Sequence, residues 1–101
     1  MSMKYFYAYE KFTSAIRTLT IGEGDVRSRL RGTHYDLRHI QEEDLPEYLY
    51  PDYEWVISQM TRFGPRRRIR NSTGAKIAER ILHIYFELNS LYFNQDTQFE
   101  I

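Results

Sequence analysis

The apolar residues of this chain recur at alternating steps of four and three, and they do so in four separate segments. In the last segment the pattern runs through Ile77, Ile81, Ile84, Leu88 and Leu91. Because an α-helix turns once every 3.6 residues, this spacing places one apolar stripe along one side of a helix. The period of two that a half-buried strand would need is absent from the sequence. We therefore predict an all-α fold, a compact bundle of about four helices.

Residues that break or cap helices set the expected bounds. Gly22 ends the first helix, and Asp25 is suited to cap the second. Pro51 suits the first turn of the third helix, which leaves Leu49 in a separate short turn before it. Gly64-Pro65 ends that third helix. The expected helices span residues 4–21, 25–40, 51–63 and 72–93.

Two starts are open for the fourth helix, one near Arg66 and one near Ser72. We prefer the later start, because Ser72 and Thr73 have the chemistry of a helix N-cap and Gly74 that of a loop.

The length of 101 residues is within the range of one domain. We expect residues 1–101 to form a single helical domain in which residues 94–101 are a loosely ordered tail.

Charge and composition argue against several classes of protein. The 14 basic and 14 acidic residues cancel, whereas dedicated nucleic-acid and membrane binders usually carry a basic excess. There is no cysteine for a disulfide or a thiolate site, and no apolar run approaches the ~20 residues that cross a bilayer. We expect a cytoplasmic protein with no membrane partner, no cofactor and no metal site.

The last predicted helix carries more apolar residues than one buried stripe needs. Between Ile81 and Phe93 they surround nearly the whole helix, which indicates that more than one side is covered. Either a second chain covers the surplus, or the tail or the aromatic N-terminus Tyr5-Phe6-Tyr7 folds over it. The first alternative predicts a protein-interaction module that self-associates as a homodimer and is not an enzyme. Its candidate interface residues are Leu82, Tyr85, Phe86, Tyr92 and Phe93.

A basic run gives a second hypothesis, a site for phosphate or nucleic acid. Guanidinium groups close to a helix N-terminus bind phosphate well, and hydroxyl groups follow the run. The alternative is that the run pairs with the acidic stretch 36–54, whose net charge of −6 balances the net +6 of residues 62–80. The candidate anion-binding residues are Arg66, Arg67, Arg68, Arg70, Lys76 and Arg80.

A third hypothesis comes from Arg29-Leu30-Arg31-Gly32-Thr33-His34. This hexapeptide resembles the R-x4-H pattern of HEPN-type ribonucleases, which are all-α and usually dimeric. The resemblance implies that Arg29 and His34 act on an RNA phosphate. It covers six residues, and Leu30 stands where the family favours a polar residue. No other nucleophile or nucleotide-binding motif occurs in the sequence.

Overall fold

The computed structural model describes residues 4–62 and 70–97. These residues form four α-helices, two short 3-10 turns and no strand, which confirms the predicted all-α bundle. The elements are α1 (Phe6–Ile21), α2 (Val26–Leu37), η1 (Glu42–Asp44), η2 (Glu47–Leu49), α3 (Tyr50–Arg62) and α4 (Asn71–Thr97).

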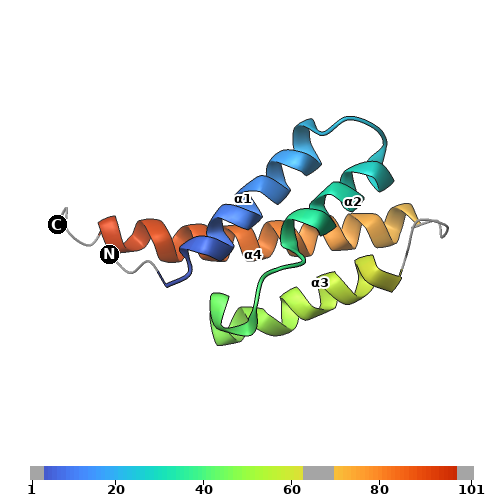
Figure 1. Cartoon of the computed structure of the whole chain (residues 1–101). Coiled ribbons are helices and arrows are strands. Elements are labelled where there is room, and N and C mark those ends of the chain that lie inside the picture. The colour runs from blue at the N-terminus through green and yellow to red at the C-terminus, as the bar shows by residue number, and fades with distance from the viewer. Residues whose placement is uncertain (1–3, 63–69, 98–101) are drawn as a thin grey trace.

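Helix α4 is the longest element and the one on which the others pack. Its 27 residues extend over roughly 40 Å. Figure 1 shows α1 and α2 as an antiparallel pair on one side of α4, with α3 on another. The axis of the fold is therefore a single helix whose remaining side faces away from the other three.

The turn between α1 and α2 follows the sequence closely. Asp25 caps α2 by accepting a hydrogen bond from the Ser28 N–H at 2.9 Å, as predicted. Gly24 has a φ of +90°, a conformation that a residue with a Cβ adopts only with strain. The Gly22 N–H donates to the Thr18 carbonyl and completes the last turn of α1. These local contacts reverse the chain and hold the two helices antiparallel.

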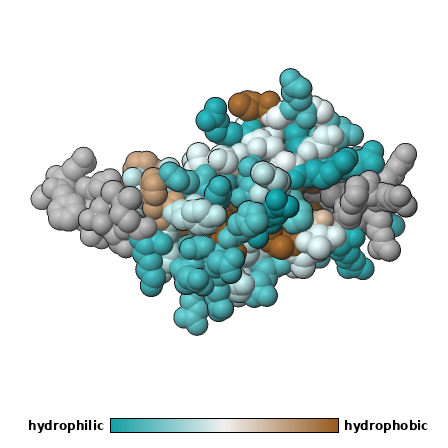
Figure 2. Space-filling model, in the orientation of Figure 1, coloured by the Kyte–Doolittle hydropathy of each residue, from teal (hydrophilic) through white to brown (hydrophobic). Residues whose placement is uncertain are grey.

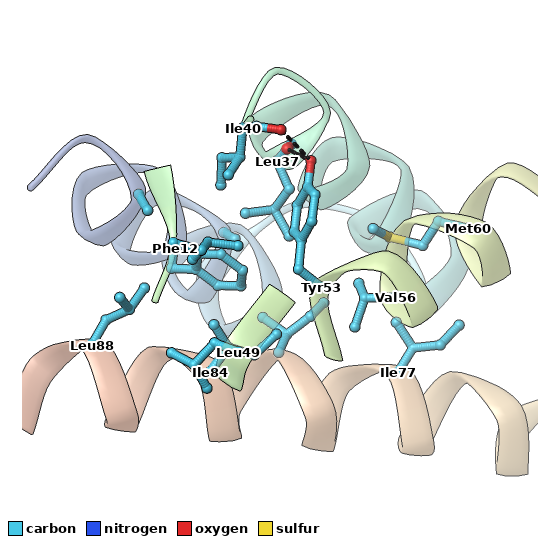
Figure 3. Close-up of a cluster of buried hydrophobic side chains, with 14 of the residues drawn as sticks. Phe12, Leu37, Ile40, Leu49, Tyr53, Val56, Met60, Ile77, Ile84 and Leu88 are labelled. Carbon is cyan, nitrogen blue, oxygen red and sulfur yellow. Dashed lines mark hydrogen bonds between the residues drawn. The ribbon is translucent and has the colours of Figure 1, made fainter. Parts of the chain in front are cut away.

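The centre of the molecule contains buried apolar residues from all four helices (Figure 3). In the connection between α2 and α3, the Tyr53 hydroxyl donates to the Leu37 carbonyl at 2.8 Å and lies 3.1 Å from the Ile40 carbonyl. The buried apolar residues are Ala8, Phe12, Ala15, Leu30, Leu37, Ile40, Leu45, Leu49, Tyr53, Val56, Met60, Ile77, Ile81, Ile84 and Leu88.

Helix α2 ends earlier than its apolar spacing predicts. It stops at Leu37, although Ile40 still enters the core from the following turn. The Tyr53 hydroxyl contacts the carbonyls of Leu37 and Ile40 and so holds the turn that follows the helix. Ile40 can therefore stay buried although it is not part of α2. Leu49 lies in the separate turn η2 and is buried, as predicted.

Helix α4 differs from its predicted bounds at both ends. It begins at Asn71, close to the preferred later start, but Gly74 is a buried helical residue and not part of a loop. It continues to Thr97, four residues beyond the predicted end, because residues 94–97 contain no glycine or proline to stop it. Residues 63 and 98–101 of the predicted third helix and tail lie outside the described residues.

Helices α1 and α2 approach each other closely at Gly32. A Cβ placed on Gly32 would lie only 2.9 Å from the Thr18 Cγ2 atom. Helix α1 also buries two small residues, Ala8 and Ala15. The Thr18 hydroxyl also donates to an Asp36 carboxylate oxygen at 3.0 Å. The absence of a side chain at Gly32 therefore allows α2 to lie close to Thr18 of α1.

Candidate functional site

The aromatic residues at the start of α1 cover one flank of α4. The Tyr9 ring stacks on the Tyr92 ring with 5.0 Å between centroids and on the Tyr85 ring with 6.1 Å. The Phe6 ring lies 5.9 Å from the Tyr92 ring, and the Tyr9 hydroxyl donates to the Asn89 side chain at 3.4 Å. Burial, followed by the proximity of Tyr85, raises the pKa of Tyr9. Two of the five candidate interface residues are thus covered from within the chain.

The other three candidates remain exposed on a different side of α4. Leu82 is 39% exposed, Phe86 57% and Phe93 48%. With 100° between successive residues, all three lie within about 40° of arc, and the exposed Ala75 lies in the same line. We call these four residues the outer stripe. The Phe93 ring makes edge contacts with the Tyr92 ring at 5.0 Å and with the Tyr9 ring of α1 at 6.4 Å, so it borders the covered flank while about half of its surface stays exposed.

The outer stripe contrasts with most of the surface. The face of the molecule shown in Figure 2 is largely hydrophilic, with apolar atoms in small separate areas. Large exposed apolar side chains elsewhere in the described chain are single residues on other elements, such as Ile21 at the end of α1 and Tyr35 on α2. Single exposed apolar residues are ordinary, whereas several in line on one helix indicate an interaction surface.

A second candidate region is a polar groove between α3 and α4 with a volume of about 770 Å³. Arg80 donates to the Asp52 carboxylate at 2.7 Å, and its guanidinium lies 4.9 Å from the centre of the Trp55 ring. The His83 Nε2 atom is 3.9 Å from the same carboxylate. Lys76 also lines this groove. The Arg80 guanidinium group in this groove is therefore already paired with the Asp52 carboxylate.

This groove accounts for only part of the predicted anion site. Arg80 is bound by Asp52, a single ion pair between the stretches 62–80 and 36–54. Lys76 and Arg70 are exposed at the start of α4, and Arg66, Arg67 and Arg68 lie outside the described residues. Asp52 and Trp55 were not among the predicted site residues. Their positions at i and i+3 on α3 indicated a shared helix face, but nothing indicated that this face meets Arg80.

Arg29 and His34 take up separate positions on α2. The Arg29 Nη1 atom donates to the Leu19 carbonyl at 3.1 Å, one of the last carbonyls of α1 that has no partner within its helix. Burial, followed by the charge of Arg38, lowers the pKa of His34. Five positions apart on one helix, the two side chains leave the axis about 140° apart. Arg29 therefore caps the end of α1 instead of converging with His34.

Comparisons with known proteins give no relative. Neither protein-family models, curated proteins nor solved structures contain a match to this chain. Within residues 4–62 and 70–97, no helix combines the length and apolar character needed to cross a membrane. In the same ranges, no three histidine or acidic side chains gather as metal ligands would. The candidate site therefore rests on its own geometry.

Proposed function

We propose that this domain is a self-association module and that its partner is a second copy of the same chain, bound through the outer stripe of α4. The observation that carries the proposal is the alignment of Leu82, Phe86 and Phe93 on one exposed side of the longest helix. The aromatic N-terminal turn of α1 packs on Tyr85 and Tyr92 and touches the edge of Phe93, and it leaves Leu82, Phe86 and about half of the Phe93 surface exposed. A second helix laid along the outer stripe would bury it.

The area of the outer stripe fits a concentration-dependent dimer. Each phenylalanine has roughly 100 Å² of its ring surface in water, since aromatic side chains carry about 150–250 Å² and these two are about half exposed. Burying that area contributes about 2–3 kcal/mol for each ring. Four such rings in a symmetric dimer give about 10 kcal/mol, comparable to the ~4–15 kcal/mol lost in association. We therefore expect reversible pairing rather than a permanent dimer.

The test is the mass of the protein in solution as a function of concentration, measured by light scattering and sedimentation. We expect the wild-type mass to rise toward twice the 12.3 kDa of one chain. Phe86→Ser should remain a monomer over the same range. Ile21→Ser is the matched control, because it removes an apolar side chain that is 72% exposed at the far end of α1. It should associate like the wild type.

Two results would refute the proposal. One is a wild-type protein that stays monomeric at the highest concentration reached. The other is equal weakening by Ile21→Ser and Phe86→Ser, which would point to general stickiness of exposed apolar residues. Circular dichroism of each variant checks that its helical content is unchanged.

Phosphate binding through the basic run ranks below self-association. The pairing of Arg80 with Asp52 removes one of its six cations. A gel-shift assay at low salt tests it, and no shift would end the idea. The ribonuclease hypothesis ranks third, because Arg29 is held by the Leu19 carbonyl. RNA cleavage that His34→Ala leaves unchanged would remove it.

A further inference from the structure

We infer that the two copies pair with their α4 helices antiparallel, related by a two-fold axis that passes close to Ile84. This inference rests on the proposed self-association and adds its direction and register. Three features of α4 carry it: the symmetry of the outer stripe, the sizes of its residues and the direction of the helix dipole.

The outer stripe is symmetric about Ile84. Ala75 and Phe93 lie nine positions on either side of it, and Leu82 and Phe86 lie two positions on either side. A two-fold axis between antiparallel helices therefore places the outer stripe of one copy directly against the outer stripe of the other. A symmetric dimer needs such a self-complementary patch, because both copies contribute the same surface. Ile84 itself points into the core, so the axis crosses the opposite, exposed side of the helix.

The sizes of the residues in the outer stripe favour the same direction. In this register Phe93 of one copy faces Ala75 of the other, and Phe86 faces Leu82. A large ring then meets a methyl group, and the two helices keep an even separation along the interface. A parallel pair would place Phe93 against Phe93 and Ala75 against Ala75. That arrangement splays the helices at one end and leaves a gap at the other, which loses packing contacts.

The helix dipoles also distinguish the two directions. The charged side chains of α4 do not, because Arg80 is paired with Asp52 and Glu87 accepts a hydrogen bond from Tyr48, both on a side of α4 away from the outer stripe. Antiparallel pairing sets the two helix dipoles in opposite directions, which is favourable, whereas parallel pairing aligns them.

Disulfide cross-linking tests this arrangement, and the absence of cysteine from the wild type gives a clean background. The two single-cysteine variants, Ala75→Cys and Phe93→Cys, are purified and mixed under mild oxidation. The mixture is compared with each variant alone on a non-reducing gel. We expect cross-linked dimer in the mixture at least tenfold above either single. In the antiparallel pair, identical positions are 18 residues and thus about 27 Å apart along the axes, too far for a disulfide.

A distance measurement keeps both phenylalanines in place. A spin label on Ala75→Cys should report an inter-label distance of about 27–30 Å in the antiparallel dimer, and well under 20 Å in a parallel one. Rapid cross-linking of Ala75→Cys alone, or a short label distance, would overturn the inference while leaving self-association intact. A wild type that dimerises, together with a mixture that does not cross-link, would overturn it in the same way. A monomeric wild type would refute the proposed function as well.

Discussion

The hydroxyl group of Tyr53 offers the sharpest test of how the α2–α3 connection is held. Tyr53 is 5% exposed, and its hydroxyl contacts the carbonyls of Leu37 and Ile40 at 2.8 and 3.1 Å. The one hydroxyl proton is shared between these two carbonyls. In Tyr53→Phe the Leu37 carbonyl keeps the Ile40 N–H at 3.2 Å, whereas the Ile40 carbonyl loses its share of the hydroxyl proton. A buried polar group left unsatisfied costs about 1–3 kcal/mol. We expect the free energy of unfolding to fall by this amount, and Tm to fall by about 4–8 °C for each kcal/mol lost.

Urea denaturation followed by far-ultraviolet circular dichroism measures this loss. The matched control is Tyr48→Phe, which removes a hydroxyl from a tyrosine that is 57% exposed and whose bond to Glu87 is 3.3 Å long. That control should change stability by less than about 0.5 kcal/mol. If Tyr53→Phe costs no more than the control, the Ile40 carbonyl has another partner and our account of the connection is wrong.

The same hydroxyl gives the protein a defined response to alkaline pH. Burial, followed by the proximity of Tyr50, raises the pKa of Tyr53 to about 12 from an ordinary value of 10.0. The contribution of this proton is therefore complete below pH 10. Between about pH 10 and pH 12 the unfolded state gives up the proton first, so the contribution is lost as the pH rises. We expect the stability advantage of the wild type over Tyr53→Phe to shrink across that window, and an advantage that stays constant would contradict the assignment.

Three further changes probe the helices that position the outer stripe, each measured by chemical denaturation. Ile81→Ala or Leu88→Ala should cost about 2–5 kcal/mol, because both side chains are buried under the other helices, and a cost under ~1 kcal/mol at both would mean that the wrong face of α4 is inward. Gly32→Ala should destabilise by about 1–3 kcal/mol because its Cβ would press on Thr18, and a stabilised variant would show that α1 moves away without cost. Asp25→Ala should cost about 0.5–2 kcal/mol through loss of the α2 cap, whereas Asp25→Asn should keep most of it.

The helices could be predicted well from the sequence because their signals are local. A 4-3-4-3 spacing fixes one side of a helix, and Asp25 acts within its own turn. In α1 the same spacing runs through Tyr5, Tyr9, Phe12, Ile16 and Leu19, but only Phe12 of these is fully buried, and Ala8 and Ala15 are buried instead. The reason is that α1 packs against two other helices at once, α2 at Thr18 and α4 at the Tyr9 ring, so its buried side is not the side that carries the apolar spacing. Closeness between two helices depends on residues from both, so the pattern within one helix does not contain it.

The polar groove shows the same limit for charged residues. Two stretches of the sequence carry equal and opposite charge, which left open whether they pair. The pairing of Asp52 with Arg80 requires α3 to lie along α4 at one particular height and rotation. That placement follows from how Val56 and Ile77 pack in the core, which no charge pattern encodes.

The sequence predicts that the last helix has more apolar residues than one buried face needs, but it does not predict which of them are exposed. Nine apolar positions between Ile81 and Phe93 exceed what one buried face uses, so some had to be covered by another segment or exposed. Tyr85 and Leu82 are only about 60° apart around the axis, yet α1 covers the first and leaves the second in water. What decides between them is the side of α4 on which α1 lies. Which apolar residues of α4 stay exposed therefore depends on how another helix packs, and the pattern within α4 does not contain that placement.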